Sequence, residues 1–133
     1  MAEEALNGGP ARLRGPQAGT AGEDLACRHL EAQGCRILAR NFRCRSGEID
    51  VIARDGEVTV FVEVKDRAGR THGEGHESVT FGKRRRVVRA ARLYAATRGI
   101  SEQPMRFDVI SIERDGGGDR IRHDRGAFDA DGR

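Results

Sequence analysis

Four ionisable residues stand in a stretch of the chain that otherwise has the pattern of two buried strands. The stretch is GEIDVIARDGEVTVFVEVKDR, residues 47–67, and the four residues are Glu48, Asp50, Glu63 and Lys65. Side chains of a strand alternate between its two faces, so Glu63 and Lys65 share one face, as do Glu48 and Asp50. Charged groups on faces this apolar need partners, because an uncompensated buried charge is costly.

A short turn brings two of these carboxylates together. Asp55-Gly56 is a hairpin signal, and Asp50 and Glu63 lie at similar distances from it, which makes them near neighbours across the ladder. Two carboxylates at this range repel each other unless a cation lies between them. A hard cation such as Mg²⁺ accepts carboxylate oxygens, a backbone carbonyl and waters. The spacing indicates a metal site, although for Glu63 and Lys65 alone an ion pair at a strand end is an equal alternative.

Glu23 is a further candidate, from a helix predicted in TAGEDLACRHLEAQG, residues 20–34. It is spaced with Cys27 and Leu30, at i+4 and i+7, on the apolar stripe that packs against a sheet. It also follows Thr20 by three residues, which is the spacing of a capping box. Both roles, helix cap and site residue, are open from the sequence.

A long basic helix is predicted after a glycine-rich loop. Residues 78–98 contain seven basic residues and no acidic residue. Such a face can bind a polyanion by releasing counterions, although a solvated helix face is an equal alternative. Lys83 is spaced with Val87 and Ala90 and can face the cleft, and five arginines are candidate contacts to a nucleic-acid backbone: Arg84, Arg85, Arg86, Arg89 and Arg92. Because the chain has no Trp and one Tyr, stacking on single-stranded bases is expected to be secondary.

The elements that position these residues are a helix, three strands, a second helix and a final strand. The strands are predicted in CRILARNFR, GEIDVIAR, EVTVFVEVK and MRFDVISIE, with Gly34 and Gly99 ending the helices. Strict alternation puts Ile49 on the face opposite Asp50 and Ile52. A three-stranded meander followed by a helical crossover implies an α/β fold with a mixed β-sheet flanked by helices, in the order αβββαβ.

One domain is expected from 133 residues. Residues 1–20 are predicted to be a mobile N-terminal arm and residues 114–133 a Gly-rich charged tail, in which Ile121 or Phe128 could dock as a short edge strand. The ordered domain is therefore residues 21–113. No apolar run reaches the length of a membrane span and the N-terminus lacks a signal-peptide pattern, so we expect a cytoplasmic protein that does not bind membranes.

Other metal or redox sites are less favoured. Cys27, Cys35 and Cys44 are odd in number and form no CxxC pair, which is typical of reduced thiols. His72 and His76 are four residues apart, but the glycines between them disfavour a helix and no third ligand is evident. The loop around the two histidines is expected to be flexible and able to close over a substrate.

The motifs, taken in order, resemble the YraN-type family of bacterial proteins. That family belongs to the PD-(D/E)XK, or restriction endonuclease-like, nuclease superfamily and is similar to archaeal Holliday-junction resolvases. The resemblance covers about residues 21–113 and is carried by GED in the first helix, GEIDVIA, FVEVKDR, the lysine of the second helix and RFDVI. An E-x-K alone is a weak signal, but the ordered set is specific. It implies a restriction endonuclease-like core.

The resemblance also implies roles for single residues. Asp50 and Glu63 would bind Mg²⁺ or Mn²⁺ together with the backbone carbonyl of Val64, and Glu23 would contact the metal through water. Lys65 would position or deprotonate the attacking water and stabilise the charge that develops on the phosphate. These are the expected catalytic and metal-binding residues.

Two functions are open from the sequence. The first is a metal-dependent phosphodiester hydrolase, an endonuclease acting on DNA that is branched or damaged. The second is a nucleic-acid-binding or partner-binding module with the same fold and little or no catalytic activity. Glu48 has a weaker claim to the site and could form a hydrogen bond near it. Because related resolvases work as dimers, DNA and a second copy of the chain are the implied partners.

Overall fold

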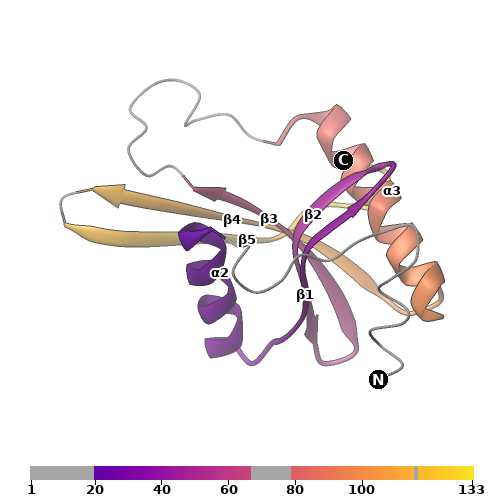
Figure 1. Ribbon diagram of the computed structural model, residues 1–133, viewed down its shortest axis with the longest axis horizontal. Coiled ribbons are helices and arrows are strands. Elements are labelled where there is room, and N and C mark those ends of the chain that lie inside the picture. The colour runs from indigo at the N-terminus through magenta and orange to yellow at the C-terminus, as the bar shows by residue number, and fades with distance from the viewer. Residues whose placement is uncertain (1–19, 67–78, 116) are drawn as a thin grey trace.

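The part of the chain that the structure describes forms a five-stranded mixed sheet with two helices. The computed structural model describes residues 20–66, 79–115 and 117–133. Its elements are α2 (Ala21–Ala32), β1 (Arg36–Cys44), β2 (Gly47–Asp55), β3 (Val58–Asp66), α3 (Phe81–Arg98), β4 (Met105–Asp115) and β5 (Gly118–Phe128). The strands lie in the order β1-β2-β3-β4-β5, and every neighbouring pair is antiparallel except β3 and β4 (Figure 1). This confirms the predicted α/β class and the αβββαβ order, to which β5 is added.

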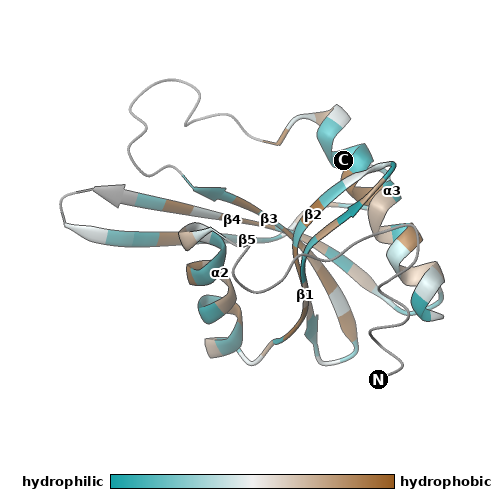
Figure 2. Ribbon diagram, viewed as in Figure 1, coloured by the Kyte–Doolittle hydropathy of each residue, from teal (hydrophilic) through white to brown (hydrophobic). Residues whose placement is uncertain are grey.

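The two helices cover opposite faces of the sheet. On β3, Phe61 packs in a cluster with Tyr94 of α3, whereas its neighbour Val62 packs in a second cluster with Leu30 of α2. Figure 2 shows how the hydrophobic colouring concentrates along the central strands and on the helix sides nearest to them. Because side chains alternate along β3, Glu63 lies on the same face as Phe61, which is the face covered by α3.

Side-chain caps fix where each helix begins. The Thr20 hydroxyl accepts a hydrogen bond from the Glu23 N–H at 3.1 Å, and Glu23 accepts one from the Thr20 N–H at 3.3 Å, so the predicted capping box is present. Thr80 caps α3 by accepting from the Lys83 N–H at 3.2 Å. Gly99 ends α3 with a φ of 71°, as predicted, because glycine adopts this left-handed conformation without strain.

The hairpin of β1 and β2 departs from regular strand geometry. Its register shifts between Ile37 and Ala39, and Asn41 has a φ of 55°. Ile49 and Ile52 both pack in the cluster under α3, although strict alternation puts them on opposite faces. The prediction for Ile49 was therefore wrong, because irregular residues make the hairpin bend and twist more than a regular ladder does.

The sheet continues beyond residue 113, where the sequence predicted a Gly-rich tail. β5 is an eleven-residue strand that pairs with β4 from Asp115–Gly118 to Phe107–Phe128. Phe128 is buried, as the expected docking of this residue requires, but the strand is far longer than a short edge strand. Most of β5 faces solvent, so its sequence lacks the apolar alternation that reveals a strand.

Two predictions lie outside the described residues. They are the mobile arm at residues 1–20, of which only Thr20 is described, and the loop that contains His72 and His76. Within the described ranges, no helix has the length and apolar character needed to cross a membrane.

Candidate active site

The ladder between β2 and β3 ends beside two carboxylates. Its last pair on this side is Val51 with Val62, so Asp50 and Glu63 are the next residues of the two strands. The Asp50 carboxylate accepts a hydrogen bond from the backbone N–H of Val64 at 2.8 Å. The Asp50 carboxylate thus accepts from the Val64 N–H in place of a backbone carbonyl of a neighbouring strand. This bond holds the carboxylate at the end of the ladder. The structure brings the two carboxylates together, and their role as metal ligands stays a prediction.

Burial and negative neighbours raise the pKa of Asp50 to about 8. The loss of water is the largest cause, the charge of Glu63 adds to it, and the Val64 N–H opposes it. Glu23 and Glu48 contribute further negative charge. A carboxyl with this pKa is mostly protonated at pH 7, whereas a bound cation would favour its ionised form. The surroundings of Asp50 therefore contain too little positive charge to keep this carboxyl ionised.

Two lysines supply positive charge to Glu63. The Nζ of Lys83, on α3, lies 2.6 Å from Oε2 of Glu63, whose side chain is 6% exposed. Burial raises the pKa of Glu63 above its usual value, although the hydrogen bond and charge of Lys83 and the charge of Lys65 oppose this. Burial also lowers the pKa of Lys83, but the hydrogen bond and charge of Glu63, with the charges of Asp50 and Glu48, together outweigh it, so the net shift is upward. Lys83 is thus a direct partner of a site carboxylate.

Glu23 reaches this region from α2 and binds Asn41, which no motif of the sequence indicates as a site residue. Glu23 is buried, and its Oε1 accepts a hydrogen bond from Nδ2 of Asn41 at 2.8 Å. The register of β1 and β2 places Asn41 opposite Asp50. Asparagine tolerates the positive φ of this position better than most residues do. Both roles considered for Glu23 are compatible with the structure, since it caps α2 and its charge raises the pKa of Asp50.

Two arginines of β1 form ion pairs with acidic residues around Asp50 and Glu63. Nη2 of Arg40 lies 2.8 Å from Asp24 and 3.8 Å from Glu23. Nε of Arg43 lies 3.5 Å from Glu48, whose side chain is 41% exposed. Glu48 therefore lies at the rim, where solvent screens its charge, and Asp50 and Glu63 form the centre of the cluster.

Asp50 and Glu63 provide the oxygen ligands that Mg²⁺ or Mn²⁺ prefers. The bond from Val64 uses one of the two oxygens of Asp50, and Lys83 contacts one of the two oxygens of Glu63. Among the residues that the structure describes, no three His, Cys, Asp or Glu side chains form a complete metal-binding group. Further ligands would come from backbone, water or substrate, which is usual for Mg²⁺. The acidic pair and the raised pKa of Asp50 fit such a cation.

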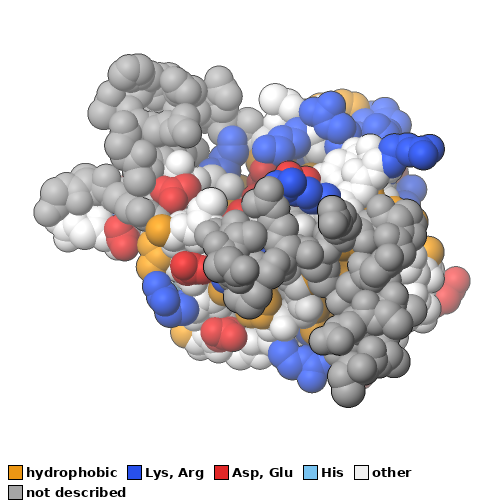
Figure 3. All heavy atoms as spheres, in the orientation of Figure 1, with side chains coloured by type: hydrophobic (Ala, Val, Ile, Leu, Met, Phe, Trp, Pro, Cys, Tyr) orange, Lys and Arg blue, Asp and Glu red, His pale blue; other side chains and the backbone are white. Residues whose placement is uncertain are grey.

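The arginines of α3 form an inward and an outward group. Arg84 is partly buried: its Nε donates to the Val79 carbonyl at 2.9 Å, and its guanidinium lies 5.6 Å from the ring centroid of Phe128. The other predicted nucleic-acid contacts, which we call the outward arginines, are exposed: Arg85, Arg86, Arg89 and Arg92. Figure 3 shows Lys and Arg side chains gathered on the surface over α3. The outward arginines, and not Arg84, are open to a phosphate backbone.

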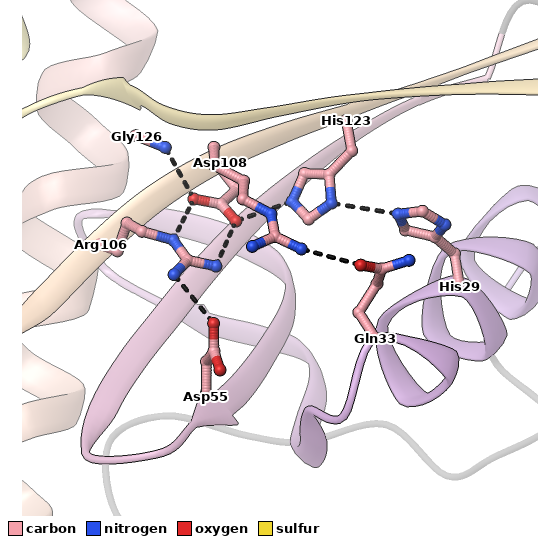
Figure 4. Close-up of polar contacts among 8 residues, drawn as sticks. His29, Gln33, Asp55, Arg106, Asp108, His123 and Gly126 are labelled. Carbon is pink, nitrogen blue, oxygen red and sulfur yellow. Dashed lines mark hydrogen bonds and ion pairs between the residues drawn. The ribbon is translucent and has the colours of Figure 1, made fainter.

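A second charged cluster lies on the face of the sheet covered by α2 (Figure 4). The buried carboxylate of Asp108 accepts hydrogen bonds from Arg106 at 2.9 and 3.0 Å and from the Gly126 N–H at 3.0 Å, and lies 2.8 Å from Nε2 of His123. Burial raises the pKa of Asp108, but these partners outweigh it and hold the pKa below its usual value. His123 also lies 3.1 Å from His29 of α2. The cluster joins β4, β5 and α2, and its balanced charges indicate a structural role.

The mixed sheet, a helix on each face and the carboxylates at the end of the β2–β3 ladder define a restriction endonuclease-like α/β protein. The sequence profile of the Uncharacterised protein family UPF0102 matches residues 22–112. The chain belongs to this family, which confirms the resemblance to YraN-type proteins.

Its relatives align over most of both chains. A UPF0102 protein from Symbiobacterium thermophilum is 55% identical over 97 residues, which cover 73% of this chain and 82% of the relative. One from Parafrankia sp. is 48% identical over 83% of this chain and 94% of the relative. One from Myxococcus xanthus is 46% identical over 91% of this chain and 94% of the relative. The names of these relatives state a family and no activity, so the function is argued from the site.

Proposed function

We propose that this protein is a metal-dependent nuclease that hydrolyses phosphodiester bonds in DNA. The observation that carries the proposal is the pair formed by Asp50, which is partly buried, and Glu63, which is buried. The charges of Lys65 and of Lys83, from the basic helix, both act on Glu63. A purely structural cluster would balance its charges, because a buried unpaired charge costs several kcal/mol. Here the pKa of Asp50 is raised to about 8, first by burial and then by the negative charges around it, of which that of Glu63 contributes most. A divalent cation would offset both effects, because it favours the ionised form.

Each residue of the cluster has a proposed role. Asp50 and Glu63 hold Mg²⁺ or Mn²⁺ with the carbonyl of Val64, and Glu23 contacts the metal through water. When bound, the cation supplies a water of lowered pKa and neutralises the scissile phosphate. Lys65 positions the attacking water and stabilises negative charge that develops on the phosphate.

Lys83 and the outward arginines place the DNA. The bond between Lys83 and Glu63 holds the first turn of α3 against the carboxylates. The outward arginines on the same helix then contact phosphates, which gives affinity and register without reading the base sequence. This division of roles makes Lys83 a positioning residue, whereas Lys65 acts on the reacting atoms.

A DNA-binding module without catalysis is the second candidate, and the bond between Lys83 and Glu63 favours it. At 2.6 Å, the ammonium group neutralises Glu63 without any metal. A site closed in this way binds DNA through α3 and does not cut it. The two candidates differ in whether a divalent cation replaces Lys83 as the partner of Glu63.

The test is a cleavage assay on labelled linear, single-stranded, flapped and four-way DNA with Mg²⁺, Mn²⁺ or EDTA. We expect metal-dependent cutting that is lost in Asp50→Ala and in Lys65→Ala, while both variants still bind DNA. Glu48→Gln, at the exposed rim, is the matched control and should keep most of the activity. Binding without cutting, equal in the native protein and Asp50→Ala, would reject the nuclease in favour of the binding module.

A further inference from the structure

A groove lies between α3 and the segment that follows β5. It has a volume of about 480 Å³, within the range of small-ligand sites. Its lining from α3 is Phe81, Arg85, Val88, Arg89 and Arg92, and its lining from the segment is Ala130, Asp131 and Arg133. Four guanidinium groups and one carboxylate therefore surround this space, which favours an anionic ligand.

The segment of residues 129–133 is a fixed wall of the groove. Oδ1 of Asp129 accepts hydrogen bonds from the N–H groups of residues 131 and 133 at 2.9 and 3.0 Å. The Gly132 carbonyl accepts from Arg84 at 3.4 Å, and the Ala130 carbonyl accepts from Arg92 at 3.3 Å. Gly132 has a φ of 82°, and a Cβ there would lie 3.1 Å from Cγ of Arg85. A glycine thus lets the wall approach the helix closely.

Phe81 gives the groove an exposed aromatic surface. It is the first residue of α3, and it is 45% exposed although it is large and apolar. The guanidinium carbons of Arg85 and Arg133 each lie 5.6 Å from the centroid of its ring. That distance is near the outer limit of a cation–π contact, so a flat ligand can replace either cation at little cost. The ring is therefore available to a ligand.

We propose that this groove binds one unpaired nucleotide of a DNA strand, with the base on Phe81 and the adjoining phosphates on the arginines of the groove. An aromatic ring beside several guanidinium groups is the chemistry that holds single-stranded nucleic acid. A base within an uninterrupted duplex cannot stack on the ring, because its neighbours cover both of its faces. The proposal rests on the proposed function and adds a substrate class: DNA with an unpaired nucleotide, as at a flap, a gap or a branch.

The position of Phe81 relative to the carboxylates supports this substrate. Phe81 precedes Lys83 by two residues, and Lys83 contacts Glu63. Two residues correspond to roughly 200° around a helix, so the side chains of Phe81 and Lys83 leave opposite sides of the first turn of α3, whose diameter with side chains is about 10 Å. A strand that passes the start of α3 reaches both. The composition predicted that stacking would be secondary, and the proposal departs from this expectation because of the placement of Phe81.

The test measures binding in EDTA, so that it does not depend on cutting. A single-stranded 12-mer and the matching duplex each carry one 2-aminopurine, whose fluorescence falls when it stacks. With the native protein we expect this fluorescence to fall on the single strand only. Phe81→Ala should weaken single-strand binding by about tenfold or more and leave duplex binding within about twofold. Phe81→Trp should restore the binding and the quenching.

Ile121→Ala is the matched control, because Ile121 is the other large hydrophobic side chain that is exposed in the described part of the chain. It should leave both affinities unchanged. Equal affinities of the native protein and Phe81→Ala for the single strand, or an equal loss on the single strand and the duplex, would overturn the proposal. Phe81-dependent binding by a protein that never cuts DNA would uphold this inference and reject the nuclease.

Discussion

The carboxyl of Asp50 binds its proton more tightly in the folded chain than in the unfolded chain. Its pKa rises from 3.8 to about 8, first because it is buried and then because Glu63 is close. Between these pH values the folded state keeps a proton that the unfolded state releases. The free energy of unfolding therefore falls as the pH rises through this window. The fall equals the cost of ionising Asp50 in its partly buried position beside Glu63.

Asp50→Asn should be more stable than the native protein at pH 8 without metal. The amide is uncharged and its oxygen can still accept from the Val64 N–H, so we expect a gain of about 1–3 kcal/mol at pH 8 that shrinks toward pH 4. Urea unfolding in EDTA at several pH values measures it, with Glu48→Gln as the exposed control. Added Mg²⁺ should stabilise the native protein more than the variant. A variant less stable than the native protein at pH 8 contradicts this account of Asp50.

At the scale of elements, the start of α2 lies very close to the end of β3. A Cβ on Gly22 would lie 2.8 Å from Cβ and Cγ of Asp66, closer than such atoms approach. Glycine at this position lets the helix bring its next residue, Glu23, to Asn41 and the carboxylates. In α3, by contrast, a Cβ on Gly82 would have no heavy atom within 4 Å apart from its chain neighbours and the backbone of its own helix.

Gly22→Ala should push the first turn of α2 away from β3. We expect a loss of about 1–3 kcal/mol in the free energy of unfolding, as for other overpacked positions, and reduced cutting because Glu23 moves. Gly82→Ala is the matched control and should be neutral or stabilise by about 0.5–1 kcal/mol, since alanine favours a helix. Chemical denaturation of the two variants tests this. Equal changes in the free energy of unfolding would show that α2 can move away from Asp66 without loss of stability.

The sequence predicted the elements whose hydrophobic pattern is strong. The alternating valines predicted β3 as residues 57–65, and the structure has Val58–Asp66. β5 could not be predicted at its full length because it is mostly exposed, and an exposed edge needs no apolar alternation. The positive φ of Asn41 follows from an irregular hairpin, and the partnership of Lys83 with Glu63 depends on how α3 packs. The spacing along the chain predicts that Asp50 lies near Glu63. The contributions of Asn41 and Lys83 become visible only in the tertiary fold.

Across the whole molecule, positive charge is concentrated although the net charge is only +3. The outward arginines lie along one helix, and Arg84 on the same helix turns inward to Val79, Gly132 and Phe128. In the proposed function, contacts between outward arginines and phosphates would release counterions, whereas Arg84 packs β5 and its following segment on α3. Neighbouring arginines would thus have different roles.

Replacing Arg86 and Arg89 together by alanine should weaken DNA binding and its dependence on salt. Each lost phosphate contact lowers the slope of log affinity against log salt by about 0.9, so the double variant should lose about 1.8. Fluorescence anisotropy between about 50 and 200 mM salt measures the slope. Arg84→Ala should instead lower the free energy of unfolding and keep the slope, and a slope change equal to that of an outward arginine would contradict its structural assignment.

The exposed edge of β5 limits how two copies of the chain can meet. β5 is last in the sheet order, and its charged residues include Asp119, Arg120, Arg122 and Asp124. Charges on an edge strand oppose the addition of a strand from another molecule. A continuous intermolecular sheet through β5 is therefore unfavourable, which protects the protein from edge-to-edge aggregation. If two copies associate, side-chain contacts and not the backbone of β5 would join them.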